Sequence, residues 1–170
     1  MNIALIGYRG SGKTTIGKLL ANRLWMDFVD TDALIAARAG KTIREIFDAG
    51  GEVAFRDLES AVIADVLTKD NQVVALGGGA ILRPENLQRI KAAARVIYLQ
   101  ADAATLHARI LADPATAQTR PSLTVAGGSL EEVQTLLAQR DPHYRAAADA
   151  TLEVNRLTPQ DAATYITRLV

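Results

Sequence analysis

The chain has 170 residues, of which 49% are hydrophobic and 22% are charged, which is typical of one globular domain with a single core. Its formal net charge is zero, so no overall field attracts nucleic acid or an anionic membrane, and any anionic ligand has to be held by locally placed cations. It contains no cysteine, which excludes disulfides, thiolate metal sites and a thiol nucleophile.

Five short apolar runs predict five β-strands. They cover residues 3–6, 28–30, 72–76, 95–99 and 151–154. Helical periodicity or capping residues predict helices over 13–24, 51–68 and 84–93, two short helices after residue 30, and helices that begin after Asp102, Ser129 and Thr158. Val53 and Leu58 are among the apolar positions of the helix over 51–68, and Thr42 and Glu45 form a capping box. Pro142 is expected to kink or end its helix.

Strands that alternate with helices predict an α/β fold with three layers, α/β/α, around a parallel five-stranded sheet. We expect residues 1–170 to form one domain. Ligands of such sheets bind beyond the carboxyl ends of the strands. The loops after the first three strands are therefore where a site is expected.

The first apolar run begins at Asn2, which leaves no room for a signal peptide. No apolar stretch approaches the roughly 18 residues that a helix needs to cross a bilayer. We therefore expect a cytoplasmic protein whose partners include neither nucleic acid nor a membrane.

A glycine-rich loop follows the first strand and opens the first helix. Residues 7–14, Gly-Tyr-Arg-Gly-Ser-Gly-Lys-Thr, fit the pattern G-x-x-x-x-G-K-[ST], which predicts a P-loop NTPase fold. In such loops backbone N–H groups surround phosphate oxygens, Lys13 can reach the β- and γ-phosphates, and the Thr14 hydroxyl can ligate Mg²⁺. The alternative is a tight glycine turn that only caps the helix.

Two aspartates, Asp30 and Asp32, lie two residues apart at the end of the second strand. The two-residue period of a strand sends both carboxylates to the same side, toward the phosphate loop. One could orient Mg²⁺ through water while the other accepts a proton from a substrate hydroxyl. The alternative is that Asp32 or Thr31 caps the following helix.

Gly77, Gly78 and Gly79 end the third strand and would let the backbone approach a ligand closely, unless they form only a turn. Arg56 and Arg140 could converge on a carboxylate or phosphate, although a solvated Arg56 paired with Glu52 or Glu59 is the alternative. Arg120 could reach a transferring phosphoryl group, or it could be an exposed loop cation.

These elements together resemble the shikimate kinase family. The resemblance is carried by the following segments: residues 7–14, Asp30-Thr31-Asp32, Gly51-Glu52 with Phe55-Arg56 and Glu59, Leu76 to Ala80, Arg120-Pro121, and Arg140 to Tyr144. They occur in the family's order and cover nearly the whole chain. The phosphate loop is shared with many NTPases, whereas the D-T-D, F-R-x-x-E and G-G-G-A segments are more specific.

The resemblance implies ATP-dependent phosphorylation of shikimate at its 3-hydroxyl, a step in chorismate and aromatic amino-acid synthesis, by a monomer that uses Mg²⁺. It implies an acceptor-binding region at about 31–60 and a mobile lid at about 112–128, whose sequence lacks clear periodicity. Together with the motifs above, the resemblance implies that ATP is bound by Gly10, Ser11, Gly12, Lys13, Thr14, Thr15, Arg109, Arg120 and Arg156, and Mg²⁺ by Thr14 and Asp30. Shikimate is expected to be bound by Asp32, Arg56, Gly77, Gly78, Gly79 and Arg140. The expected catalytic residues are Lys13, Asp32 and Arg120.

The two histidines, His107 and His143, lack metal-ligand spacing, and we expect Tyr98 and Tyr144 to be packing residues. Two other functions stay open at this point. One is a different P-loop small-molecule kinase, acting on gluconate or a nucleoside monophosphate. The other is a regulatory module that only binds the nucleotide or hydrolyses it slowly.

Overall fold

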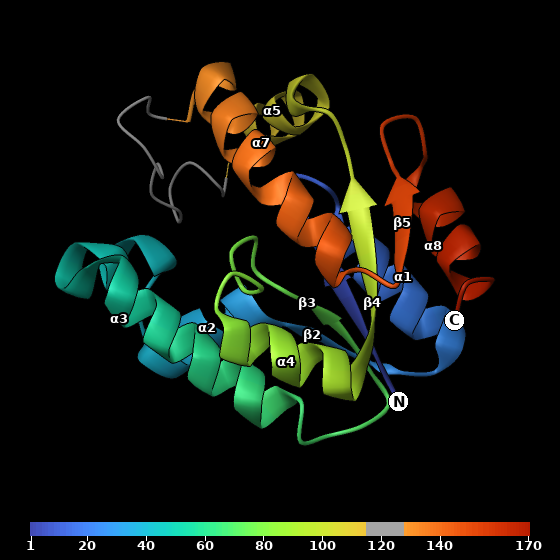
Figure 1. Cartoon of the computed structure of the whole chain (residues 1–170), viewed down its shortest axis with the longest axis horizontal. Helices are drawn as coiled ribbons and strands as arrows, with labels where there is room; N and C mark the ends of the chain where they lie inside the picture. Colours follow the sequence, from blue (N-terminus) through green and yellow to red (C-terminus); the bar gives the residue numbers. More distant parts are fainter. Residues whose placement is uncertain (115–127) are drawn as a thin grey trace.

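The computed structural model describes residues 1–114 and 128–170, which form one layered body (Figure 1). The predicted lid falls mostly outside these ranges, and so does Arg120. Among the described residues, no helix combines the length and apolarity that a membrane crossing requires.

A single parallel sheet of five strands forms the middle layer, in the order β2-β3-β1-β4-β5. The strands are β1 (Asn2–Ile6), β2 (Asp27–Asp30), β3 (Gln72–Ala75), β4 (Ala94–Gln100) and β5 (Ala150–Glu153). All five predicted strands are confirmed, and each observed end lies within one residue of its predicted position. Since β1 has neighbours on both sides and helices over both faces, all its residues are buried, which explains its uninterrupted apolar sequence.

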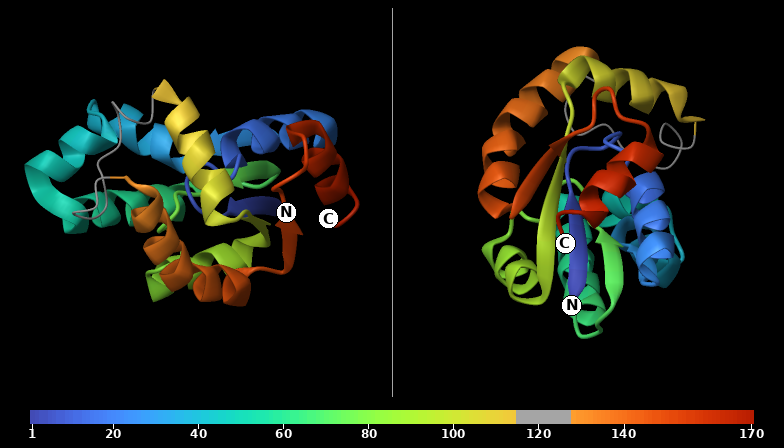
Figure 2. Two further views of the ribbon diagram at one scale, coloured as in Figure 1. Left: turned by 90° about the horizontal axis from the view of Figure 1, so that it is seen from above. Right: turned by 90° about the vertical axis from the view of Figure 1, so that its right-hand side faces the viewer.

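Helices cover both faces of the sheet. They are α1 (Lys13–Leu24), α2 (Thr31–Ala39), α3 (Ile43–Val66), α4 (Pro84–Ala93), α5 (Ala103–Ala112), α7 (Leu130–Ala147) and α8 (Pro159–Thr167). Figure 2 shows α1 and α8 packed together on one face, with α4 and α7 on the other. The predicted three-layer α/β/α architecture is therefore confirmed. Its core combines strand residues such as Leu5 and Ile97 with helix residues such as Leu20 and Ile90, all completely buried.

The segment after β2 contains the two short helices and the long helix that the sequence predicts. Thr42 caps α3 through the expected capping box with Glu45, and α3 continues to Val66 as two helical pieces that meet at Gly51, where the long helix is predicted to begin. Gly51 has φ 74° and ψ −172°, a conformation open to glycine. Val53 and Leu58 are 70% and 38% exposed, because only one face of α3 packs against α2 and α4.

Pro142 does not end its helix, which was one of its two predicted effects. It lies inside α7, which continues to Ala147. A proline inside a helix costs about 3 kcal/mol in helix stability. Tyr144 and Ala147, which follow it, are completely buried, and burial of this last part of α7 offsets that cost.

Candidate active site

The phosphate loop lies between β1 and α1, at the carboxyl edge of the sheet. Gly10 and Gly12 have φ values of 87° and 93°, and Gly12 is the N-cap of α1 without using a side chain. No side chain therefore occupies the start of α1, where the positive end of the helix dipole favours an anion. Lys13 Nζ donates hydrogen bonds to the carbonyls of Gly7 at 2.7 Å and Tyr8 at 3.1 Å, which holds its ammonium group over the loop.

Thr14 and Asp30 meet at the edge of this loop. The Thr14 hydroxyl donates to Asp30 Oδ2 at 2.7 Å. The other oxygen of Asp30, Oδ1, accepts from the backbone N–H groups of Asp32 at 3.0 Å and Ala33 at 3.2 Å. Asp30 is thus the N-cap of α2, while its second oxygen remains directed to the phosphate loop. The residue that caps the helix is neither Thr31 nor Asp32.

Asp32 reaches the site by a different route from the one predicted. β2 ends at Asp30, and Asp32 lies in the first turn of α2, so strand alternation does not explain its direction. The helix start is fixed by Asp30 and by Thr31, whose hydroxyl accepts from Gly77 N at 3.2 Å and donates to the Ala75 carbonyl at 3.3 Å. These bonds hold α2 against the end of β3, and they bring Asp32 beside Gly77.

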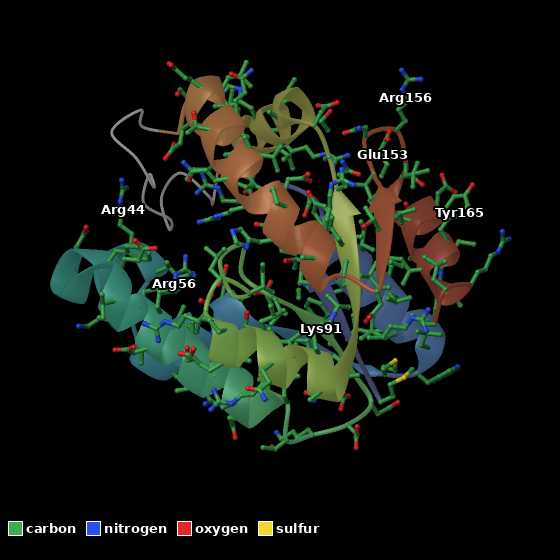
Figure 3. The ribbon with its side chains drawn as sticks, in the orientation of Figure 1. Arg44, Arg56, Lys91, Glu153, Arg156 and Tyr165 are labelled. Atoms are coloured by element: carbon green, nitrogen blue, oxygen red, sulfur yellow. The ribbon has the colours of Figure 1, made fainter. Side chains whose placement is uncertain are left out.

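Arg56 lies on α3, with its side chain only 11% exposed (Figure 3). Its Nη1 donates to Glu59 Oε1 at 2.7 Å, its Nε lies 3.6 Å from Glu52 Oε1, and its Cζ lies 5.2 Å from the centroid of the Phe55 ring. The expected alternative, pairing with Glu52 and Glu59, is therefore present. It does not place Arg56 in solvent, because Glu59 is itself completely buried.

Glu59 has surroundings that the sequence did not reveal. Its Oε2 is buried and has no hydrogen-bond partner among the residues that the structure describes. Burial raises the pKa of Glu59, and Arg56 acts against that rise. The neighbouring carboxylate of Asp32 raises it further. Glu59 therefore fixes the guanidinium group of Arg56 through a hydrogen bond in a buried part of the site.

Each glycine after β3 faces at least one of the charged residues. A Cβ atom on Gly77 would lie 2.7 Å from Asp32 Oδ1 and 2.8 Å from Glu59 Oε2, and one on Gly78 would lie 3.3 Å from Arg140 Nη1. A Cβ on Gly79 would overlap the guanidinium group of Arg56. None of the three glycines has a positive φ. Close approach of side chains, and not an unusual backbone turn, therefore explains their small size.

Arg140 lies on α7 with its Cζ 5.8 Å from the centroid of the Tyr8 ring. Tyr8 belongs to the phosphate loop and is 3% exposed. Burial raises the pKa of the Tyr8 phenol, whereas Arg140 and Arg9 lower it. Arg140 is thereby packed against the phosphate loop on one side and Gly78 on the other.

Two cavities adjoin at this edge of the sheet. One, of about 350 Å³, is lined by the phosphate loop and α1 together with Asp30, Asp32, Arg109 and Asp113. The other, of about 60 Å³, is lined by residues from all the segments just described: Tyr8, Arg9, Asp32, Ile43, Phe47, Phe55, Arg56, Glu59, Gly77, Gly78, Gly79 and Arg140. Arg9 and Asp32 line both cavities. An anion in the first and a small polar molecule in the second would therefore meet at Asp32.

Most of the residues that are expected to bind ATP line the larger cavity, but Ser11 and Arg156 do not. Gly10, Gly12, Lys13, Thr14 and Thr15 line the larger cavity, whereas Ser11 is completely buried beneath the loop. Arg109 lines it as well, and donates to the carbonyls of Gly10 at 3.4 Å and Val154 at 3.1 Å. Arg156 is exposed and points outward from the loop after β5 (Figure 3), so the structure does not bring it to this cavity.

Some residues of the site were missed or given a different role by the sequence. Tyr8 and Arg9 occupy variable positions of the loop motif, so the motif carries no signal for their part in the second cavity. Phe47 packs on Phe55 with ring centroids 5.0 Å apart. Helical spacing does not predict this contact, because the kink at Gly51 lies between the two residues. Tyr144 is buried as expected, but its hydroxyl also bonds to the Gly78 carbonyl.

Among residues 1–114 and 128–170, no group of three or more histidine, cysteine, aspartate or glutamate side chains is arranged to hold a metal ion. A metal in this site would instead be held by Thr14 and Asp30 together with oxygens of the nucleotide and water. Hydroxyl, carboxylate and phosphate oxygens are the ligands that Mg²⁺ takes in nucleotide sites.

Comparison with known proteins identifies the family of this chain. The family model "Shikimate kinase" matches residues 9–170. Shikimate kinase of Symbiobacterium thermophilum is 43% identical over 98% of this chain and 94% of its own length, and that of Rhodopirellula baltica is 41% identical over 97% and 88%. A solved structure, shikimate kinase from Acinetobacter baumannii in complex with shikimate, superimposes with a TM-score of 0.92 at 37% identity, covering 99% of this chain and 91% of that one. The chain belongs to the shikimate kinase family.

Proposed function

We propose that this protein transfers the terminal phosphoryl group of ATP to the 3-hydroxyl of shikimate, giving shikimate 3-phosphate and ADP. The observation that carries the proposal is the junction of the two cavities at Asp32. One cavity has the phosphate loop, and the other has two arginines beside a carboxylate. Family membership supports shikimate as the acceptor, because a relative of the same fold is described in complex with it.

The nucleotide side consists of the phosphate loop and Lys13. Backbone N–H groups of Gly10 to Thr15 would hold the phosphates, since the N-terminus of α1 is capped by no side chain. Lys13 Nζ donates to loop carbonyls in this structure and would bind the β- and γ-phosphates of ATP. Arg109 would border the adenosine from α5. Arg156 would need to turn inward to contact it.

Mg²⁺ fits the pair formed by Thr14 and Asp30. The hydroxyl and carboxylate oxygens lie 2.7 Å apart at the mouth of the larger cavity. Thr14 would bind the ion directly and Asp30 would bind it through water. When bound, Mg²⁺ neutralises charge on the β- and γ-phosphates.

The acceptor side would bind shikimate through its carboxylate and hydroxyl groups. Arg56 and Arg140 lie beside consecutive parts of the Gly77–Gly79 segment, and planar guanidinium groups suit a planar carboxylate. Asp32 would hold the 3-hydroxyl and accept its proton as the oxygen bonds to the γ-phosphorus. The bond between that phosphorus and the β,γ-bridging oxygen breaks in the same step, leaving ADP.

Arg120, which lies outside the described residues, is expected to approach the transferring phosphoryl group from the lid. Closure of such a segment would exclude water, so that shikimate and not water accepts the phosphoryl group. We also propose that the protein works as a monomer in the cytoplasm, without nucleic acid or membrane partners.

A panel of acceptors tests this function. ADP release is followed in a coupled assay with MgATP alone and with shikimate, gluconate or a nucleoside monophosphate added. We expect release that depends on shikimate and stays near the background rate with the others. Release that another acceptor stimulates more strongly would indicate a different kinase, and equal release without any acceptor would indicate a hydrolysing module.

A further inference from the structure

Tyr144 is a completely buried residue of α7 that lies one turn after Arg140. Its hydroxyl donates to the carbonyl of Gly78 at 2.5 Å. Packing alone does not require this hydroxyl, since a phenylalanine would fill nearly the same volume. A buried phenol does, however, need a partner for its O–H group. The partner it has belongs to the segment that lines the acceptor cavity.

The Gly78 carbonyl and Arg140 are held by the same short part of α7. Residues four apart on a helix share one face, so Arg140 and Tyr144 approach Gly78 together. A Cβ on Gly78 would lie 3.3 Å from Arg140 Nη1 and 3.6 Å from the Tyr144 hydroxyl oxygen. Burial raises the pKa of Tyr144 to about 12, with Arg140 acting in the opposite direction, so the phenol keeps its proton and remains a donor at neutral pH.

The bond to Gly78 also fixes a second group. The peptide unit between Gly78 and Gly79 is planar and, like every peptide bond of the described chain, not cis. In a trans unit the N–H of Gly79 points to the side opposite the Gly78 carbonyl. By holding the carbonyl against α7, Tyr144 therefore also sets the direction of the Gly79 N–H, at a residue that lines the acceptor cavity.

We propose that the Tyr144 hydroxyl is a positioning group for the acceptor: it locks the Gly78–Gly79 peptide unit to the turn of α7 that carries Arg140. This inference rests on the proposed function. The consequence is specific to one substrate, because Tyr144 does not line the larger cavity. Loss of the hydroxyl should loosen the acceptor side and leave ATP binding unaffected.

The chain contains a matched control in Tyr98 on β4. Its ring packs on Tyr144 with centroids 4.9 Å apart, and it is equally buried. Its hydroxyl instead donates to Asp141 Oδ1 at 2.8 Å, while Arg145 Nε donates to Asp141 Oδ2 at 2.7 Å. Tyr98→Phe therefore removes the same atom from a neighbouring ring without touching the Gly78 carbonyl.

Steady-state kinetics of Tyr144→Phe and Tyr98→Phe, each first shown to be folded by circular dichroism, test the proposal. Losing a hydrogen bond and leaving a buried carbonyl without it should raise the KM for shikimate about tenfold in Tyr144→Phe. The KM for ATP should stay within about twofold of wild type in Tyr144→Phe, because the change lies outside the larger cavity. In Tyr98→Phe the KM values for ATP and for shikimate should both stay within about twofold of wild type, because the Tyr98 hydroxyl bonds to Asp141 and not to Gly78.

An unchanged KM for shikimate in folded Tyr144→Phe would overturn the inference. So would an equal rise for both substrates, or the same rise in Tyr98→Phe, since either would mean a general loosening of α7. Replacement of Tyr144 by 4-aminophenylalanine restores a donor and should return the KM for shikimate toward wild type. If Tyr144→Phe does not fold, 4-fluorophenylalanine at this position, which fills the space of the hydroxyl without donating, carries the test: a raised KM for shikimate with a wild-type-like KM for ATP supports the proposal, and no change in either constant contradicts it.

Failure of this inference is distinguishable from failure of the proposed function. If wild-type protein releases no ADP in response to shikimate, the function itself is wrong. If wild-type protein turns over shikimate and Tyr144→Phe does so with unchanged constants, only the role of Tyr144 is wrong.

Discussion

Asp32 has the surroundings that a proton acceptor at this junction needs. It is 8% exposed, lines both cavities, and lies next to a glycine that leaves room for its oxygen. Its side chain is fixed by the start of α2 and not by a long flexible stem. That rigidity allows a hydroxyl bound beside Arg56 and Arg140 to meet the carboxylate in one defined position.

Asp32→Asn should lower kcat on the order of a hundred- to ten-thousand-fold, because the amide keeps the shape but accepts no proton. The unfolding midpoint in urea should change little. Asp48→Asn, at an exposed position that lines neither cavity, is the control and should keep wild-type turnover. A kcat within about threefold of wild type in Asp32→Asn would rule out this aspartate as the base.

Arg56 has a role in which shape matters as much as charge. Arg56→Lys keeps the positive charge but loses the planar fork that suits a carboxylate. We expect the KM for shikimate to rise about 10- to 100-fold, the range for losing a hydrogen bond to a charged group, with a smaller change in kcat. Initial rates over a range of shikimate concentrations measure this. Arg38→Lys, which alters an exposed pair with Asp65, should leave the constants as they are, and an equal effect of both substitutions would contradict the assignment.

At the scale of elements, the site depends on how α2, α3 and α7 meet the segment after β3. Thr31 ties α2 to Gly77, Arg56 on α3 reaches Gly79, and Arg140 on α7 reaches Gly78. Two consecutive helices, α2 and α3, and the distant helix α7 thus converge on three consecutive glycines. The small size of these residues makes the convergence possible.

Gly79→Ala should therefore disturb the acceptor side directly. The added Cβ would overlap the Arg56 guanidinium, and Arg56 would have to move away from Glu59. We expect the KM for shikimate to rise by at least about tenfold, with the KM for ATP preserved.

Gly40→Ala provides the contrast for this experiment. Gly40 ends α2 with φ 64° and has open space around the position of a Cβ. Its replacement should cost about 1–2 kcal/mol of stability through backbone strain and leave both KM values unchanged. If Gly79→Ala also affected stability alone, close packing against Arg56 would not be the reason for the glycine.

Periodicity and caps predicted most elements of this fold, because β1, β3 and the middle of β4 are buried on both faces and several helices begin at a local cap such as Asp102 or Thr158. What they could not predict depends on tertiary contacts. The continuation of α7 through Pro142 and the exposure of Val53 follow from which faces are covered. Asp30 and Asp32 were paired correctly for the wrong reason, since a helix start and not a strand brings Asp32 inward.

The same distinction applies to the site. The phosphate loop and the glycine run are local motifs, so their residues were predicted by number. The contact of Arg140 with Tyr8 and the bond from Tyr144 to Gly78 join segments that lie far apart in the sequence. The burial of Glu59 Oε2 likewise depends on how the chain folds around it. No pattern in one sequence reports such contacts.

At the scale of the whole molecule, the buried Glu59 links the active site to overall stability. Burial raises its pKa above the ordinary value of 4.5. The folded state therefore binds this proton more tightly than the unfolded state does. The contribution is present in full below the unfolded pKa and is lost as the pH rises through the folded pKa.

Urea unfolding of wild type and Glu59→Gln between pH 4 and pH 8 measures this effect. The free energy of unfolding of wild type relative to Glu59→Gln should fall as the pH rises above about 4.5, because only wild type loses the bound proton. A constant difference between the two proteins would mean that folding leaves the pKa of Glu59 unchanged, and a difference that grows with pH would mean that Arg56 outweighs burial and stabilises the carboxylate.

The central claim is that a phosphoryl group crosses from one cavity to the other at Asp32 and is received by the 3-oxygen of shikimate. Phosphorus NMR of the reaction of wild-type protein with MgATP and shikimate tests it directly, because the phosphorus nucleus couples to the proton on the carbon that carries the new ester. Coupling to the proton at carbon 3, together with one ADP for each ester formed, is the predicted result. Inorganic phosphate in place of the ester, or an ester on another hydroxyl, would contradict the account.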